Sequence, residues 1–311
     1  MQSYPKPSAV GGTLIRKVIA QCKKLEVTLP LEEPVLIAVS GGVDSMVLAH
    51  LLARYGRRLI DPSRITLLHL DHGWRPESGK EEKSLVKNLA KELEVGFRSE
   101  KLDPPSKTLM SKNWEEDARL KRTKVFDTLA GPKQKWKYVF TAHHLDDLAE
   151  TLFFRFLRGE IFEQNKGILF NDPPVLRPFL QVSKEEIRAY AKAEKVPFLE
   201  DPTNLETDQF RGLYRARLMP HLIRHFPGLH KTLATYANRT SLNRESPLDN
   251  SLRVAIESAI GIPLNRAQRT ALSSKVSQMK VGERLSLPEG LQLKRLKNGY
   301  FIETPEPGNS R

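Results

Sequence analysis

Short apolar runs alternate with segments of helical spacing through the first two thirds of the chain. Residues 35–39 read Val-Leu-Ile-Ala-Val, an unbroken apolar run that is typical of a strand buried on both faces. Residues 46–52 then repeat apolar side chains at the spacing of a helix. Further strands are predicted at 65–69, 96–102 and 138–141, and further helices at 81–93, from 113 and from 145. This order predicts an α/β fold built on a doubly wound, mostly parallel sheet.

The pattern changes after residues 226–228, which read Phe-Pro-Gly. Helical stretches reach to about residue 280, and residues 283–302 then alternate apolar and polar side chains. Turn signals interrupt that alternation, which is typical of antiparallel hairpins. We therefore expect two domains: a larger one with a connector helix at residues 1–225, and a smaller, basic α+β domain at residues 226–311.

The charge of the chain favours a polyanionic partner. Lysine and arginine number 50 against 37 aspartate and glutamate residues, which gives a formal net charge of +13. A charge of about 2–8 in magnitude already keeps a small domain in solution, so solubility alone is the weaker explanation. Nucleic acid is the partner that this excess favours most.

The chain has a single cysteine, Cys22. An internal disulfide, a Cys-x-x-Cys zinc site and an iron–sulfur cluster are therefore excluded, and a reducing cytoplasm is the expected location. No apolar run approaches the roughly 18 residues of a membrane span, and residues 1–12 are polar and rich in Pro and Gly rather than a signal sequence. We expect a cytoplasmic protein that does not enter the membrane.

The turn after the first predicted strand carries the first candidate chemistry. Its small residues allow backbone amides to approach an anion at the start of a helix. A Gly-Gly pair by itself also serves as an ordinary tight turn. Asp44 would repel phosphates unless a divalent cation lies between them, so we expect Mg²⁺ at Asp44. The residues of this loop are Ser40, Gly41, Gly42, Val43, Asp44 and Ser45.

Polar residues also follow the second predicted strand, which ends in His69, Asp71 and His72. Ligands of an open α/β sheet bind beyond the carboxyl ends of its strands, so these side chains are expected near the glycine loop. They could ligate a metal ion, although no further clustered ligand is evident. Loop hydrogen bonds, or contacts to a nucleotide or RNA, are the favoured interpretation.

Acidic residues follow the fourth predicted strand. His143 comes first, and Asp146, Asp147 and Glu150 begin the next helix, where Asp147 and Glu150 share one face. Acidic residues in a first turn also stabilise the helix dipole, which is the structural alternative. Three carboxylates at the ligand edge of a sheet suit recognition of an ammonium group or a second metal ion.

Two basic segments are candidate contacts for phosphate or RNA. Arg119 and Arg122 lie on a helix that is dense in charge, although a surface helix often carries such charges. Further along the chain, a probable helix carries Arg211, Arg215 and Arg217. That helix would contact an RNA backbone or serve as a solvated linker.

Taken together, these segments resemble the tRNA(Ile)-lysidine synthases, which belong to the PP-loop ATP pyrophosphatase superfamily with its Rossmann-like fold. The hexapeptide Ser-Gly-Gly-Val-Asp-Ser at residues 40–45 indicates the superfamily. The block His-His-x-Asp-Asp-x-x-Glu-Thr at 143–151, Arg-Gly at 158–159 and Glu-Asp-Pro-Thr-Asn at 200–204 indicate the family within it. The chain departs from the family pattern at Gly212, where an asparagine is usual.

The resemblance implies ATP-dependent ligation of lysine onto C2 of the wobble cytidine of tRNA(Ile) with the anticodon CAU. An adenylated cytidine would be the intermediate, AMP and pyrophosphate the products, and the tRNA would change from methionine to isoleucine specificity. ATP would contact residues 40–45, His69 and His143. Lysine would contact Asp147 and Glu150, and tRNA would also contact Arg211, Arg215 and Arg217. The implied catalytic residues are Asp44, Arg119, Asp146, Asp147 and Glu150.

Other readings remain open at this point. A tRNA 2-thiolation enzyme would share the ATP loop but needs cysteines to carry sulfur, and Cys22 stands alone. NAD or GMP synthetases would not explain the basic charge. A catalytically silent RNA-binding protein would not need the intact loop and carboxylates. The oligomeric state is open, with a homodimer among the alternatives.

Overall fold

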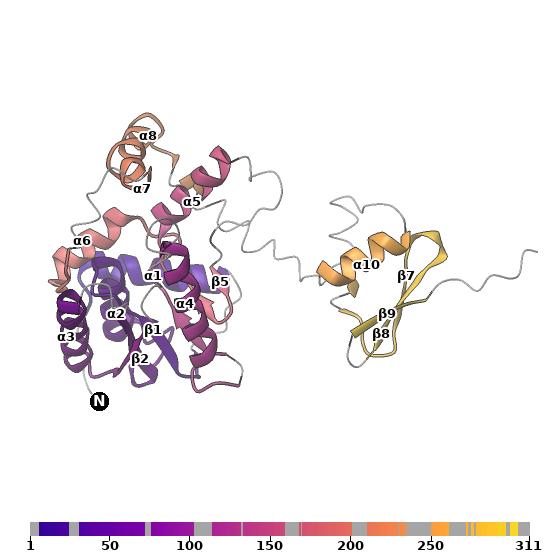
Figure 1. Cartoon of the computed structure of the whole chain (residues 1–311), viewed down its shortest axis with the longest axis horizontal. Coiled ribbons are helices and arrows are strands. Elements are labelled where there is room, and N and C mark those ends of the chain that lie inside the picture. The colour runs from indigo at the N-terminus through magenta and orange to yellow at the C-terminus, as the bar shows by residue number, and fades with distance from the viewer. Residues whose placement is uncertain are drawn as a thin grey trace, which may run out of the picture. The chain divides into compact units, whose positions relative to one another are not determined.

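The computed structural model of the chain forms two compact units, Met1–Ser241 and Leu242–Arg311, and Figure 1 draws both. The residues that the structure describes are 6–24, 31–71, 76–102, 114–131, 133–158, 168, 170–200, 210–229, 231–233, 235, 250–260, 272, 275, 276, 278–296 and 299–303.

A six-stranded sheet forms the centre of the first unit. Its first five strands in spatial order run parallel, and the sixth pairs antiparallel with the fifth at the edge. The predicted doubly wound, mostly parallel sheet is therefore confirmed. In spatial order the strands are β3 (Gly96–Lys101), β2 (Ile65–Asp71), β1 (Val35–Ala38), β4 (Tyr138–Phe140), β6 (Val175–Leu176) and β5 (Asn171–Asp172).

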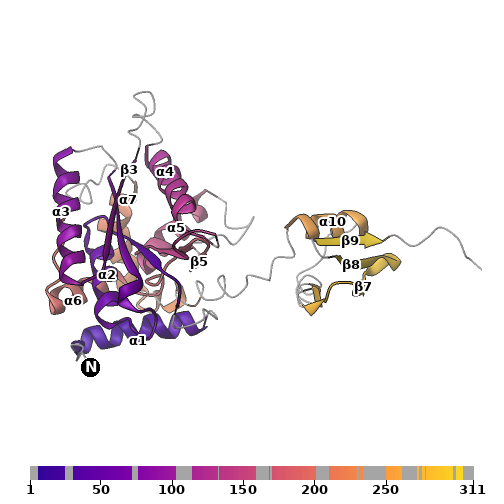
Figure 2. The same ribbon diagram turned by 90° about the horizontal axis from the view of Figure 1, so that it is seen from below.

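Helices cover both faces of this sheet. On β1, Val35 and Ile37 pack into one apolar core, and Leu36 packs on the other face with Phe126. The first core holds α1 (Ala9–Lys24), α2 (Val43–Tyr55), α3 (Pro76–Glu92), α5 (Leu145–Leu157) and α6 (Lys184–Glu194), and the second holds α4 (Trp114–Leu129). Figures 1 and 2 show α3 and α4 on opposite sides of the strands.

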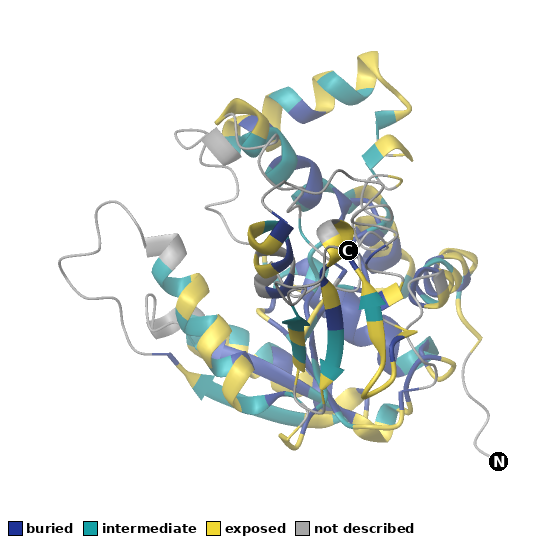
Figure 3. Ribbon diagram, turned by 90° about the vertical axis from the view of Figure 1, so that its right-hand side faces the viewer, coloured by how far each residue is buried: buried dark blue, intermediate teal, exposed yellow. Residues whose placement is uncertain are grey.

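The alternation of apolar and polar residues along each helix decides which of its faces is buried. Figure 3 shows this as bands of buried and exposed positions along the helices. Within the described residues, no helix combines the length and the apolar character that crossing a bilayer requires.

The connector segment is more complex than the single predicted helix. It consists of α7 (Phe210–Leu213), a π-helical segment (Tyr214–Leu218) and α8 (Met219–His225). Tyr214 is buried against Phe153 of α5, with ring centroids 5.3 Å apart, and its hydroxyl donates to the sulfur of Met219. These apolar contacts hold the π-helical turn, and with it the residue after Tyr214, beside α5. π-Helical turns are frequent at functional sites.

The described part of the second unit joins the helix α10 (Asn250–Ile260), and further helical residues between 272 and 278, to a small sheet. The helix α10 packs its buried residues against Leu293 and neighbouring side chains. The sheet is antiparallel, as the turn signals predict, and a short helical turn at Pro288–Gly290 joins its first two strands. The strands, in spatial order, are β7 (Arg284–Ser286), β8 (Gln292–Leu296) and β9 (Gly299–Glu303).

Candidate active site

The loop after β1 is closed by its own serines. The Ser45 hydroxyl donates to the Gly42 carbonyl at 3.0 Å and accepts from the Ser40 amide at 3.1 Å. Gly42 is the N-cap of α2, and no side chain caps this helix end among the described residues. The first-turn amides of α2 therefore remain available for an anion such as a phosphate.

Gly41 has a backbone conformation that favours glycine. Its φ of +93° lies in a region that other residues rarely adopt, and a side chain there would reach 3.4 Å from Glu82 of α3. The Gly41 carbonyl accepts a hydrogen bond from the Leu199 amide at 3.0 Å. The chain that follows α6 therefore returns to the loop and fixes its position.

Carboxylates from two helices meet around the buried imidazole of His144. Its Nε2 lies 3.8 Å from Asp44 Oδ2 and 3.6 Å from Asp147 Oδ2, and its Nδ1 lies 3.6 Å from Asp146 Oδ2. Burial alone would lower the pKa of His144, but Asp146, Asp147 and Asp44 together raise it above its usual value. Protonation of His144 therefore offsets the repulsion among these carboxylates.

Lys184 brings a second positive charge to this cluster. Its ammonium lies 2.6 and 2.7 Å from the two carboxylate oxygens of Asp44. Its backbone amide donates to Asp146 Oδ2 at 2.8 Å. Because Lys184 begins α6, this helix is tied both to the glycine loop and to the start of α5.

Arg215 reaches the remaining carboxylates from the π-helical segment. Its Nε lies 2.6 Å from Glu150 Oε2, and its Nη2 lies 3.3 Å from Asp147 Oδ1. Burial opposes the charged form of Arg215, but Glu150 and Asp147 outweigh it and raise its pKa. Glu150 itself is buried, so this guanidinium is a close counter-charge for a carboxylate that water barely reaches. Asp147 and Glu150 thus share one organic cation, the guanidinium of Arg215.

His143 lies on a more positive side of the site. Its Nδ1 is 2.9 Å from the hydroxyl of Thr141. Burial, together with the charges of Arg177 and Arg122, lowers the pKa of His143 to about 4 against the opposing effect of Asp147. At neutral pH His143 is thus an uncharged hydrogen-bonding group beside two arginines.

Arg119 and Arg122 occupy one helix, α4. Burial and the charge of Arg119 lower the pKa of Arg122, while Arg119 itself is exposed. Two guanidinium groups that repel one another are stabilised when an anion binds between them. A contact of Arg119 or Arg122 with phosphate or RNA stays a prediction.

His69 is fully buried at the end of β2. Its Nδ1 lies 3.3 Å from the carbonyl of Val39, and burial lowers its pKa. His69 thus supports the strand end from which the glycine loop departs, and the contact to ATP stays a prediction. His72, the other histidine of this predicted group, lies outside the described residues.

The structure describes several of the predicted segments only in part. Arg217 is exposed on the π-helical segment, and the side chain of Arg211 lies outside the described residues. For residues 160–171 the sequence predicts a glycine-containing loop that acts as a lid or contacts substrate, and the structure describes only residues 168, 170 and 171 of it. In the motif at 200–204, only Glu200 is described.

Sequence reasoning missed two members of the cluster. His144 belongs to the His-His pair, where only His143 received a role. Lys184 received no role; it is the first residue of α6, whose start is closed by a capping box between Ser183 and Glu186. The sequence feature that could have identified Lys184 is its position at the start of a helix that follows a strand of the sheet.

The donor set at the site fits Mg²⁺ bound together with phosphates. Among the residues that the structure describes, no three His, Cys, Asp or Glu side chains are grouped to hold a metal ion. Mg²⁺ commonly takes one or two carboxylates and completes its coordination with water and substrate phosphates. Asp44, in the first turn beside the glycine loop, is placed for that role.

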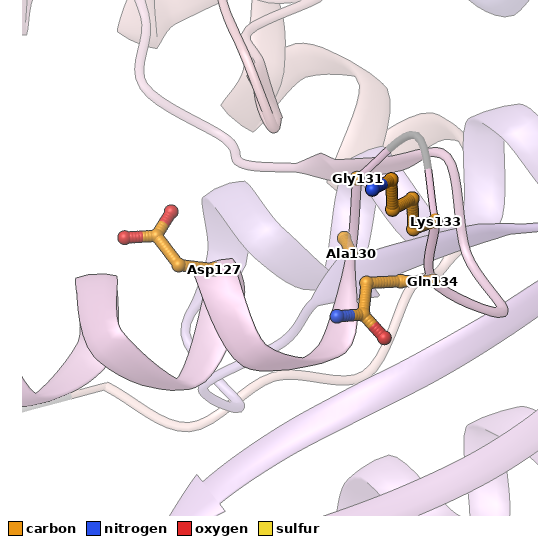
Figure 4. Close-up of a pocket in the computed structure, with 5 residues that line it drawn as sticks. All are labelled: Asp127, Ala130, Gly131, Lys133 and Gln134. Carbon is orange, nitrogen blue, oxygen red and sulfur yellow. The ribbon is translucent and has the colours of Figure 1, made fainter.

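A pocket lies elsewhere in the first unit, as Figure 4 shows. Its residues connect the end of α4 to the start of β4, so the pocket lies at the amino ends of the strands, away from the carboxylate cluster. None of its residues is a candidate from the sequence analysis. The pocket is lined by Asp127, Ala130, Gly131, Lys133 and Gln134.

The region that holds this site matches a known protein family and several known proteins. The PP-loop domain family matches residues 15–222, which include the loop and all the carboxylates described above. The tRNA(Ile)-lysidine synthase of Thermosipho africanus is 36% identical over 67% of this chain and 48% of its own length. That of Aster yellows witches'-broom phytoplasma is 34% identical over 64% and 44%. These relatives confirm the resemblance that the motifs indicate.

A third relative is a bifunctional protein. The bifunctional protein TilS/HprT of Listeria monocytogenes is 31% identical over 68% of this chain and 33% of its own length. The chain thus spans half or less of the length of these curated relatives.

Among solved structures, the U34-tRNA thiolase NcsA of Methanococcus maripaludis has a TM-score of 0.60. The match covers 77% of this chain and 82% of that protein at 16% identity. A likeness at this level of identity concerns the fold, and it agrees with the sheet and helices described above.

Proposed function

Because the chain belongs to the PP-loop domain family, whose members use ATP, we propose that it is a tRNA(Ile)-lysidine synthase. It ligates lysine to C2 of the wobble cytidine in tRNA(Ile) with the anticodon CAU. This change converts the tRNA from methionine to isoleucine specificity. The basic charge of the chain and the curated relatives support a tRNA substrate.

The first step activates the cytidine. Its C2 oxygen forms a bond to the α-phosphorus of ATP, and the bond from that phosphorus to pyrophosphate breaks. The amides of residues 40–45 stabilise the departing pyrophosphate, and Arg119 offsets charge on the adenylate. Asp44 would hold Mg²⁺. Mg²⁺, when bound, supplies further stabilisation of phosphate charge. His143 contributes an uncharged hydrogen-bonding group beside the nucleotide.

The second step joins lysine to the activated base. The ε-amine forms a bond to C2, and the bond from C2 to the oxygen of AMP breaks. Asp147 and Glu150 hold the ammonium before reaction and accept its proton, and Asp146 supports them by holding the start of α6. The observation that carries this assignment is the guanidinium of Arg215, which occupies this pair of carboxylates.

Arg215 links this lysine site to the RNA. When the lysine ammonium takes the oxygens of Asp147 and Glu150, Arg215 turns toward the tRNA backbone together with Arg211 and Arg217. Residues 1–225 form the catalytic domain, and residues 226–311 form a tRNA-binding domain. A cytoplasmic location is part of the same proposal.

A thiolation activity has no support from the described chemistry. The single thiol, Cys22, is buried in the core, and burial raises its pKa to about 12. A thiol that stays protonated and away from solvent is a poor carrier of sulfur.

A labelling experiment tests the proposal directly. The purified full chain is incubated with ATP, Mg²⁺, labelled lysine and a mixture of unmodified tRNAs, and each tRNA is then isolated. We expect label in the isoleucine tRNA with the anticodon CAU and equal amounts of AMP and pyrophosphate. Release of ADP, or tRNA that stays unlabelled with all components supplied, would contradict the proposal.

A further inference from the structure

Lys184 occupies the oxygens that a metal ion would need. Both carboxylate oxygens of Asp44 lie within 2.7 Å of its ammonium, and both side chains are about one third exposed. A metal ion on Asp44 therefore has to displace this ammonium. The displaced charge then lies beside the glycine loop, where the proposed function places the phosphates of ATP.

The backbone around Lys184 is held while its side chain is free to turn. Its amide donates to Asp146, and the preceding Ser183 exchanges hydrogen bonds with Glu186 at 2.8 and 3.2 Å. A lysine stem has four flexible carbons and ends in a compact charge. The ammonium can therefore exchange partners without movement of α6.

The balance of charge favours the transfer of the Lys184 ammonium from Asp44 to the phosphates of ATP. ATP carries more negative charge than one Mg²⁺ neutralises, and the carboxylates of Asp146 and Asp147 lie at the same edge of the sheet. An additional cation is needed when pyrophosphate leaves. Resting on the proposed function, we propose that Lys184 is a phosphate-binding residue of the ATP site, held by Asp44 until Mg²⁺ and the nucleotide arrive.

This role predicts opposite effects on two ligands. Lys184→Met keeps most of the side-chain volume but removes the charge, so Asp44 loses its competitor for metal and ATP loses a partner. In the absence of nucleotide, we expect Mn²⁺, used as a spectroscopic substitute for Mg²⁺, to bind several-fold more tightly. The affinity for ATP with Mg²⁺ falls about 10- to 100-fold, the range for one lost hydrogen bond to a charged group.

Two further variants make the result specific. Lys184→Arg keeps the positive charge and should recover most of the ATP affinity. Lys17→Met is the matched control, because Lys17 pairs with Glu186 of the same helix at 2.7 Å and is similarly exposed. This control should bind both ligands as the parent does.

The measurements use the full chain without tRNA or lysine. Electron paramagnetic resonance follows Mn²⁺ binding, equilibrium dialysis follows a non-hydrolysable ATP analogue with Mg²⁺, and thermal unfolding verifies that each variant is folded. ATP affinity within twofold of the parent in Lys184→Met would overturn the proposal, as would an equal loss in Lys184→Arg. A failure of lysine transfer alone would count against the proposed function and leave this binding result standing.

Discussion

Two buried histidines of the first unit have opposite surroundings. His50, in the middle of α2, lies with its Nδ1 2.8 Å from the hydroxyl of Tyr190 on α6. Burial is the main cause that lowers its pKa, so it is held neutral. His144 is at least as buried, yet the carboxylates around it raise its pKa. Burial alone therefore does not decide the charge of a histidine in this protein.

The two histidines belong to different arrangements: His50 to a structural network of hydrogen bonds, and His144 to the candidate site. Near His50, the hydroxyl of Tyr55 donates to Glu194 at 2.7 Å, and Glu194 also accepts from the amide of Ser8. These bonds join α2 and α6 to the residue that precedes α1, mostly through neutral groups. Around His144, four charged side chains from three helices converge, although burying charge contributes little to stability. Such concentrations of perturbed charge are typical of functional sites.

The largest effect is expected when one charge is removed from the site around His144. Asp44→Asn keeps the size of the side chain but loses the metal-binding carboxylate, so pyrophosphate release from ATP should fall about 1,000-fold. Rapid measurement of pyrophosphate under saturating ATP, lysine and tRNA tests this.

Glu92→Gln is the control for that variant. Glu92 pairs at the surface with Arg54, which lies on the same helix as Asp44 but at its other end. This control should retain the parent rate. A rate for Asp44→Asn within tenfold of the parent would remove Asp44 from the reaction.

A change in the network around His50 should alter the stability of the fold instead of the reaction rate. Tyr190→Phe removes only the hydroxyl and leaves His50 without that partner in a buried position, which should destabilise the fold by about 1–3 kcal/mol. Denaturant unfolding gives the free energy, and pyrophosphate release measured on the folded variant should stay at the parent rate. An unchanged unfolding free energy would mean that water or another group replaces the hydroxyl.

The elements of the fold were predictable where the hydrophobic pattern is periodic. Strands such as β1 and β2 carry continuous apolar runs, and the helices between them carry apolar stripes. The strands β5 and β6 have only two residues each, which is too short for any period to appear. The π-helical segment also leaves no trace in the pattern, because it differs from an α-helix only in its backbone hydrogen bonds.

The candidate site was predictable in the parts that follow strands. Asp44 and Asp147 both stand just after an apolar strand, and parallel strands bring their ends to one edge. Lys184 bonds to Asp44 across 140 residues of sequence, so no spacing rule could pair them. Arg215 was expected to contact RNA, and its contact with Glu150 across 65 residues depends on how the connector packs against α5.

The smallest expected effect is the most direct test of the comparison. Because the pKa of His144 is raised in the fold, protonation stabilises the native state, and this contribution is complete below pH 6.5 and lost as pH rises through the raised pKa. Because the pKa of His50 is lowered, its contribution has the opposite sign: the native state loses stability as pH falls below 6.5. His144→Gln should therefore lose most stability, relative to the parent, under acidic conditions.

His50→Gln should show the reverse trend, with its deficit relative to the parent shrinking as the solution becomes more acidic. Unfolding free energies of the parent and both variants, measured in denaturant at intervals from pH 5 to 8, give two difference curves. The curves should slope in opposite directions, because each variant removes one titrating group and leaves the other in place. Parallel curves would mean that the carboxylates around His144 do not hold it charged, and the distinction between the two buried histidines would then be lost.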